Sequence, residues 1–433
     1  MMEQRDSSFT KKKINIVTVL FGLFFFYLVI HRYIIEMGVP SVTKYGLDIF
    51  NVILFLLALS KRKSLSNYDK YFILCYISIL VMGTISFIVN IKSTGSNIAY
   101  FIFDIRNLLR FVMFFFSCKM LINKQNIVKI YRVILGLHFM NCILVIYQFF
   151  TLEVDIYWMR GDNLNGFFGV KTGGNIYLNA LLIATTVIAL EMWKTWEKSP
   201  QIAFLFMLLN IVIATLVELK GFYVEIAIIL IVYFAEYIKK LTAKRICIIM
   251  FVFLVCAIGM IFLIRLLYKL YPWMQGSMSS IIGMINATKS TTGSSTISRI
   301  SFMGDVYNKI FKEDIVSAIF GYGIGSANIN GTMTDLARTY YSTHYSWLSS
   351  AYMLVEVGFV GLMIYFISFI VLLIGIVKKS YMKKCGISIC LCSLFCVIYN
   401  ETFKTDAGYF LILLISISTS IDKKIRIENS YMI

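Results

Sequence analysis

The sequence predicts an all-α polytopic integral membrane protein that forms a single membrane domain over residues 1–433. Three observations predict this fold class. Apolar residues make up 59% of the chain and charged residues only 15%, and the mean hydropathy is +0.79. Apolar runs of about 20 residues recur, each long enough to cross roughly 30 Å of hydrocarbon. Because a soluble chain is nearer half apolar and a quarter charged, a soluble globular protein is excluded.

About twelve apolar segments are predicted to be transmembrane helices. The first follows three consecutive lysines and has no small-residue cleavage site of the kind that ends a signal peptide. The predicted spans are 14–35, 46–60, 71–91, 98–118, 133–150, 176–193, 201–218, 222–238, 246–266, 347–377, 386–401 and 403–421.

The basic residues predict the orientation. Lys and Arg number 25 in the short joins on the side of the two termini and 14 on the other side, which holds the longest loop. Because positive charge gathers in short cytoplasmic loops, both termini are predicted to be cytoplasmic. The net charge of +18 is thereby explained by topology, and no nucleic-acid partner is predicted. A first external functional loop, 151–175, and a large external loop between spans nine and ten, 267–346, carry the polar machinery.

The cysteines and acidic residues indicate neither disulfides nor a metal. All nine cysteines lie in or beside apolar segments, so no disulfide framework is expected in the external loops. They lack the histidine partners and spacing of a zinc site. The acidic residues of the external loops are scattered. We expect neither a metal nor a cofactor.

The fourth span carries Asp104, Arg106 and Arg110. An arginine at membrane depth costs a few kcal/mol and usually faces a polar cavity or a partner. One interpretation is that Asp104 and other polar groups satisfy the two arginines, or that they extend toward an interface. The other is an anion site that opens into the membrane. The sequence does not choose between them.

The first external loop is rich in glycine and carries Arg160, Lys171 and Asn175. Asn175 is predicted to cap the following helix, and a helix N-terminus beside two cations would suit a phosphate. The alternative is an ordinary exposed glycine loop. Lys220 lies in a very short external turn, where it is a candidate for its position alone and could equally serve solvation.

The large external loop carries the remaining candidates. Apolar residues at helical spacing over 297–311 predict an amphipathic helix on the membrane surface, with Arg299 near its start. A tight glycine turn at Phe320–Ser326 follows. His344 could act as a base or a donor at the start of the tenth span, or be an unremarkable histidine. Glu356 is an ionisable group within that span, and it could also partner a buried basic residue.

The order of these features resembles the O-antigen polymerase (Wzy-type) and O-antigen ligase superfamily of bacterial surface polysaccharide assembly. The most specific likeness is Arg299, then the Gly-x-Gly-x-Gly turn, then His344, then Glu356-x-Gly-x-x-Gly361. Tyr345 stands where the family commonly has Asn.

Two shorter stretches add to this likeness. Arg160 with the glycine-rich segment ending at Asn175 is similar to the family's first external loop, although Gly174 replaces a frequent proline. Lys220-Gly221 is similar to a turn in which relatives more often carry arginine.

The predicted topology restricts the chemistry. Nucleotide sugars and ATP are cytoplasmic, so a glycosyltransferase with external loops needs a donor already carried across the membrane. A polyprenyl-diphosphate-linked oligosaccharide is such a donor, and arginine side chains can bind its phosphates in a bidentate manner.

We expect a metal-independent repeat-unit polymerase in a bacterial plasma (inner) membrane, with membrane lipids around it. A chain-length regulator and a flippase are candidate partners. The product could be O-antigen, capsule or another surface polymer.

The expected site residues divide into two groups. The candidate catalytic residues are His344, Arg299 and Glu356. The candidate substrate-binding residues are Arg160, Lys171, Asn175, Lys220, Gly321, Gly323 and Gly325. Two other functions remain open: a ligase that transfers the glycan to lipid A-core, and a flippase of the same lipid-linked glycan. A flippase should carry more charge along its spans, so the rich external loops favour an enzyme.

Overall fold

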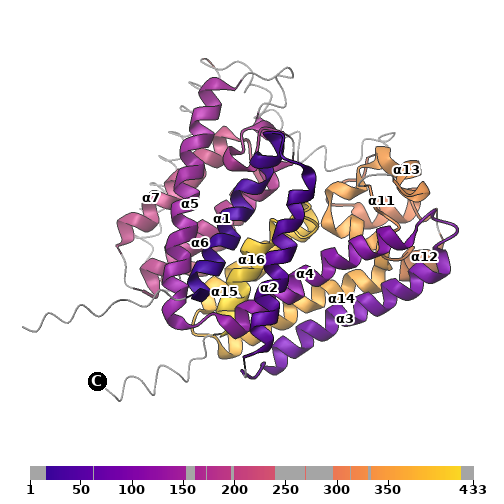
Figure 1. Cartoon of the computed structure of the whole chain (residues 1–433), viewed down its shortest axis with the longest axis horizontal. Coiled ribbons are helices and arrows are strands. Elements are labelled where there is room, and N and C mark those ends of the chain that lie inside the picture. The colour runs from indigo at the N-terminus through magenta and orange to yellow at the C-terminus, as the bar shows by residue number, and fades with distance from the viewer. Residues whose placement is uncertain are drawn as a thin grey trace, which may run out of the picture.

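In the part of the chain that the structure describes, all regular elements are helices (Figure 1). The computed structural model describes residues 16–61, 63–152, 161–171, 173–196, 199–238, 269, 296–312, 314–329 and 333–420. The long helices are α1 (Ile16–Glu36), α2 (Gly46–Leu59), α3 (Asn67–Asn90), α4 (Ile98–Leu121), α5 (Lys124–Thr151), α6 (Gly174–Lys194), α7 (Pro200–Leu216), α8 (Lys220–Ile238), α14 (Ser349–Lys379), α15 (Lys383–Tyr399) and α16 (Gly408–Ser420).

Short helices occupy the connections. Three are α-helical: α11 (Phe302–Lys309), α12 (Ile315–Phe320) and α13 (Asp335–Tyr340). The 3-10 helices are η1 (Ser41–Tyr45), η3 (Gly161–Asn163), η4 (Gly166–Phe168), η6 (Tyr341–Thr343) and η7 (Tyr345–Trp347). The described part of the predicted amphipathic segment therefore forms a helix that begins only at Phe302, and Arg299 lies in the turn before it.

The prediction of a polytopic membrane protein agrees with six helical segments that are long and apolar enough to cross a membrane. They are Ile16–Glu36, Ser41–Leu59, Asn67–Asn90, Lys124–Thr151, Gly174–Lys194 and Ser349–Lys379. Pro200–Leu216 and Gly408–Ser420 are shorter apolar helices. The predicted span 246–266 lies outside the described residues. The number of twelve spans and the cytoplasmic placement of the termini stay predictions.

Side-chain caps explain where several of these helices begin. Ser66 accepts a hydrogen bond from the backbone N–H of Asp69, whose carboxylate accepts one from the N–H of Ser66, which is a capping box at the start of α3. Asn97 and Asn123 cap α4 and α5 in the same manner with their amide oxygens. These caps satisfy backbone N–H groups that a helix start leaves without partners.

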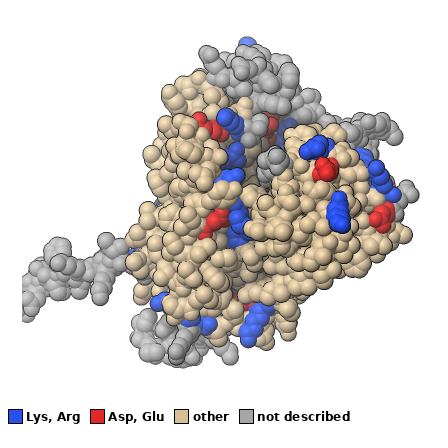
Figure 2. All heavy atoms as spheres, turned by 45° about the vertical axis from the view of Figure 1, so that its right-hand side comes forward, with Lys and Arg blue, Asp and Glu red and all other residues tan. Residues whose placement is uncertain are grey.

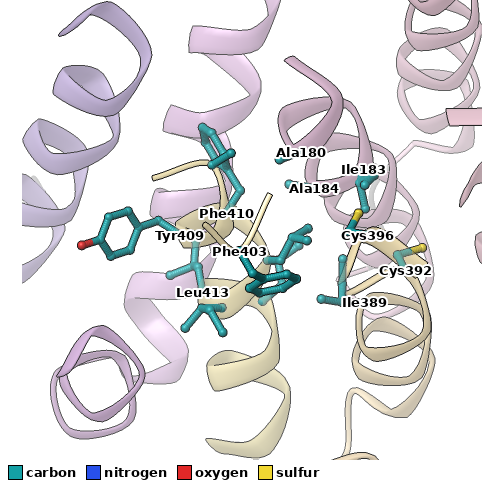
Figure 3. Packing of buried hydrophobic residues seen from close by; sticks show 14 of the residues in the cluster. Ala180, Ile183, Ala184, Ile389, Cys392, Cys396, Phe403, Tyr409, Phe410 and Leu413 are labelled. Carbon is teal, nitrogen blue, oxygen red and sulfur yellow. The ribbon is translucent and has the colours of Figure 1, made fainter. Parts of the chain in front are cut away.

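The centre of the bundle is α6, which is buried along most of its length and packs against α7, α8, α15 and α16. Small residues allow the close approach, since Ala180 and Ala184 face the neighbouring helices. Figure 3 shows Cys396 of α15 beside Ile183 of α6, whereas the thiol of Cys392 lies 3.7 Å from the carbonyl of Glu225 in α8. The seven cysteines of the described residues are free thiols, and six of them are buried as core residues.

Contacts define one end of the bundle, called here the loop end. At this end α15 finishes and α8, α14 and α16 begin. The N–H of Ser349 donates to the carbonyl of Asn400 across 2.9 Å, and a Cβ at Gly221 would lie 2.6 Å from the ring of Tyr399. The segments that are predicted to be external lie at this end, where α11 packs against α14 (Figure 1).

Candidate functional site

The connection between α15 and α16, residues 400–407, organises the loop end. It is mostly buried, with Thr402 and Ala407 fully so. The guanidinium Nε of Arg299 donates to the carbonyl of Tyr399 across 3.0 Å, directly before this connector. Lys404 donates from Nζ to the carbonyl of Ser346 across 3.0 Å. The connector therefore joins the turn that carries Arg299 to the segment that follows His344.

A buried arginine from α4 holds the connector in place. Arg110 makes an ion pair with Asp406, Nη1 to Oδ1 at 2.6 Å, and donates from Nη2 to the carbonyl of Lys404 at 2.6 Å. Its side chain is 3% exposed and that of Asp406 15% exposed. The amide of Asn51 donates to the backbone carbonyl of Arg110. Arg110 of α4, whose backbone is held by Asn51 of α2, thus fixes the position of a connector that has little regular structure of its own.

The second arginine of α4 also has a carboxylate partner. Arg106 lies 3.3 Å from Asp48 of α2, and its guanidinium is 4.5 Å from the ring centroid of Phe103. Asp104 instead accepts from Asn107 and from Asn328. Each arginine therefore pairs with an aspartate other than Asp104, while Nε of both arginines has no hydrogen-bond partner among the described residues.

Arg299 meets the start of α8 at the ring of Tyr399. Its guanidinium lies 4.8 Å from that ring centroid. The same ring packs on Gly221, where any side chain would overlap it. Because Lys220 is the first residue of α8 and precedes Gly221, the segments that carry the two sequence candidates Arg299 and Lys220 both border this aromatic ring.

The first external loop packs against the same turn. A Cβ at Gly161 would lie 3.2 Å from the carbonyl of Val217, at the end of α7. Asn175 donates from Nδ2 to Oδ1 of Asp162 across 2.9 Å. Burial raises the pKa of the Asp162 carboxyl, while the hydrogen bond from Asn175 and the charge of Lys220 oppose this rise. Asp162, Asn175 and Lys220 are therefore neighbours.

The predicted cap at α6 is wrong. The N-cap position is Gly173, with φ 89°, and it makes no side-chain cap. Asn175 is the second residue of the helix and turns instead to Asp162. The reason is the left-handed conformation at Gly173, which lets the chain enter the helix two residues earlier than expected.

Lys171, one of the two cations predicted in this loop, lies in a segment that is held against α1. The backbone N–H of Lys171 donates to Glu36 at the end of α1 across 3.3 Å, and its side chain is exposed. Arg160 lies outside the described residues. The loop is held to α1 by a second contact that the sequence did not reveal, from Nη1 of Arg32 to the carbonyl of Gly173 at 3.0 Å.

His344 lies between η6 and η7 in a left-handed conformation, with φ 53°. Its ring stacks on Trp347 with the centroids 4.0 Å apart. The preceding residue, Thr343, accepts at its carbonyl a hydrogen bond from the N–H of Ile297 across 2.8 Å. This hydrogen bond therefore joins the two segments, two residues before Arg299 and one residue before His344.

Glu356 lies inside α14 and is 2% exposed. Its Oε1 accepts from the N–H of Gly325 across 2.8 Å. The helix is broken two residues later at Gly358, with φ 66° and ψ −173°. The glycine turn fits this break, since the N–H groups of Tyr322 and Gly323 donate to the carbonyls of Val355 and Glu356.

The three glycines of the turn each allow contact with a different helix. A side chain at Gly321 would overlap the backbone of Glu356 in α14, and one at Gly323 would overlap the backbone of Phe87 in α3. At Gly325 a Cβ would lie 2.7 Å from the backbone nitrogen of Phe101 in α4. Helix packing therefore explains all three glycines without the ligand role that the sequence suggested.

Sequence reasoning missed three residues that build this site: Tyr399, Lys404 and Asp406. Lys404 and Asp406 are charged residues in an apolar C-terminal region, and this was the sequence signal that could have revealed them. Figure 2 shows Lys and Arg side chains, with a few acidic ones, in a line down the middle of one face between two broad areas that have few charged residues. Within the described residues, no group of three or more His, Cys, Asp and Glu could hold a metal ion.

No family model matches this chain, and no curated protein matches it either. The proposals below therefore rest on the residues and their geometry, together with the resemblance given above.

Proposed function

We propose that this chain is a polysaccharide repeat-unit polymerase of the bacterial plasma membrane. It would transfer a glycan en bloc from a polyprenyl-diphosphate carrier to a lipid-linked repeat unit at the outer face. The observation that supports this most is the meeting of Arg299, Lys220 and the His344 segment around the 400–407 connector. These residues come from three separate parts of the sequence, and two of them are cations suited to phosphate oxygens.

Arg299 would bind the diphosphate. Its Nε is occupied by the carbonyl of Tyr399, which fixes the plane of the guanidinium. The Nη edge then presents two parallel N–H donors, the arrangement that binds phosphate in a bidentate manner. Charge builds on the diphosphate as the glycosidic bond breaks, so this contact strengthens in the transition state and lowers the barrier.

The reaction balances without a metal. The acceptor hydroxyl oxygen forms a bond to the anomeric carbon of the donor, and the bond from that carbon to the phosphate oxygen breaks. The electron pair leaves with the polyprenyl diphosphate. The hydroxyl proton passes to the imidazole of His344, which is a suitable general base near neutral pH. Glu356 would position this site through its hydrogen bond to the glycine turn.

The test is the surface glycan of a strain without this gene, separated on a gel that resolves repeat number. We expect single repeats on the acceptor, restored to a ladder by the intact gene and by Arg338→Ala. Arg338 is a control because its side chain is 70% exposed on α13. Arg299→Ala should give no ladder at equal protein level.

Three other outcomes would contradict the proposal. Polymer that accumulates on its carrier without reaching the acceptor would indicate the ligase. The absence of any exported repeat would indicate the flippase. An unchanged ladder would refute the whole class.

A further inference from the structure

A small closed cavity lies below the loop end, between α3, α4, α14 and the 400–407 connector. Its volume is about 30 Å³, enough for one ion or one or two water molecules. The polar side chains of its lining are Asp104, Asn107, Ser349, Tyr352, Glu356 and Lys404, together with the phenols of Tyr76 and Tyr365. None of the reaction steps proposed above uses this space.

The charges that face the cavity do not balance. Asp104 and Glu356 are each 2% exposed, so two carboxylates share a site with little solvent. Lys404 is the only cation of the lining, and it lies 3.5 Å from Glu401 as well. The arginines of α4 are paired elsewhere, with Asp48 and Asp406. With both carboxylates ionised, the lining carries an excess of one negative charge, which is costly at low dielectric.

The hydrogen bonds around the two carboxylates favour their charged form. Both oxygens of Asp104 accept from side-chain amides, those of Asn107 and Asn328. Oε1 of Glu356 accepts from the backbone N–H of Gly325. The phenol of Tyr352 interacts with both carboxylates and has one proton to share between them. N–H donors stabilise the carboxylate and not the acid, so these contacts offset part of the cost of burying two charges, and a cation in the cavity would offset more of it.

An unsatisfied hydroxyl in the lining is the second, independent sign of a ligand. Ser349 is 2% exposed, and its Oγ has no hydrogen-bond partner among the described residues. A buried hydroxyl without a partner costs free energy that an ion or a water would recover. Broken membrane helices place ions at such points, and α14 is broken at Gly358, two residues from Glu356.

We propose that this cavity binds one sodium ion. Its ligands are carboxylate oxygens of Asp104 and Glu356, the hydroxyl of Ser349 and the phenol oxygen of Tyr352, which are hard oxygen donors. A single positive charge neutralises the lining, whereas a divalent ion would leave an excess of the opposite sign. The bound ion ties α4 to α14 below the loop end, so its effect is on the stability of the fold and does not depend on the proposed reaction.

The experiment is thermal unfolding of the purified full chain in detergent, followed by tryptophan fluorescence. Sodium chloride replaces choline chloride at constant ionic strength and pH. We expect Tm to rise with sodium to a plateau, by on the order of 2 °C. Glu356→Gln, which keeps the size and the acceptor oxygen, should abolish this response. Ser349→Ala should raise the half-saturating sodium concentration several-fold.

Asp335→Asn is the matched control, since this carboxylate is 68% exposed and does not line the cavity. It should keep the full sodium response. Equal Tm in sodium and choline would overturn the proposal. So would a sodium response that Glu356→Gln and Ser349→Ala both retain unchanged. A third result would also overturn it: a Tm that does not respond to sodium at any pH but rises on acidification to the value expected at the sodium plateau. That result would show that the two carboxylates share a proton and bind no sodium ion.

Discussion

The ion pair between Arg110 and Asp406 should control the stability of the loop end. Arg110→Met removes the cation and keeps most of the aliphatic volume. Asp406 is then left as a carboxylate that is only 15% exposed, and the carbonyl of Lys404 loses its donor. Removing one partner of a buried pair costs about 3–5 kcal/mol, because the remaining charge stays buried without compensation. For a chain of this size that corresponds to a Tm decrease of roughly 3–6 °C.

The assay is thermal unfolding of the purified protein in detergent, with Arg110→Met, Asp406→Leu and the double variant measured side by side. The double variant leaves no unpaired charge, so it should lose less stability than the sum of the single variants. We expect a coupling of about 2 kcal/mol. Additive losses, or an Arg110→Met variant as stable as the native chain, would refute the ion pair as the element that holds the connector.

Three further predictions address the glycine turn, the arginine and the buried aspartate. Gly323→Ala should cost more than about 3 kcal/mol, because φ is 102° and a Cβ would overlap the backbone of Phe87; reduced yield of folded protein in size-exclusion chromatography checks this. Arg299→Lys should lower the turnover of a lipid-linked donor at least tenfold, since lysine cannot bind phosphate in a bidentate manner. A monodisperse Arg299→Lys protein with native turnover would contradict this. The raised pKa of Asp162 favours its protonated form in the fold, so its contribution to stability falls as pH rises through that pKa. Asp162→Asn should therefore gain Tm relative to the native chain at pH 7 and not at pH 3.5.

Much of the helical framework could be predicted from the sequence, because a bilayer forces apolar segments of about 20 residues into helices. Most described helices coincide with the predicted spans to within a few residues, but α5 begins nine residues before the predicted 133 and α16 five residues after the predicted 403. Asn97 and Asn123 mark the starts of α4 and α5. The break in α14 at Gly358 was not predicted. Nothing in an apolar run with two glycines tells which glycine leaves the helical conformation.

The candidate site could be predicted only in part. Arg299 and His344 lie in segments joined to each other, as their order in the sequence suggested. The connector was missed because Asp406 finds its partner, Arg110, almost 300 residues earlier in the chain. The glycine turn was assigned to a ligand, whereas tertiary packing against three helices accounts for it. Such long-range contacts leave no local pattern in a single sequence.

The most direct test of the central claim uses the purified chain in liposomes with a polyprenyl-diphosphate-linked repeat unit as both donor and acceptor. Products are separated by repeat number, and released polyprenyl diphosphate is measured in the same samples, with a chelator present. The account predicts a ladder of lipid-linked glycans, one diphosphate carrier released for each new linkage, and loss of both with Arg299→Ala. A substrate that stays at one repeat, or a ladder that Arg299→Ala still forms, would contradict it.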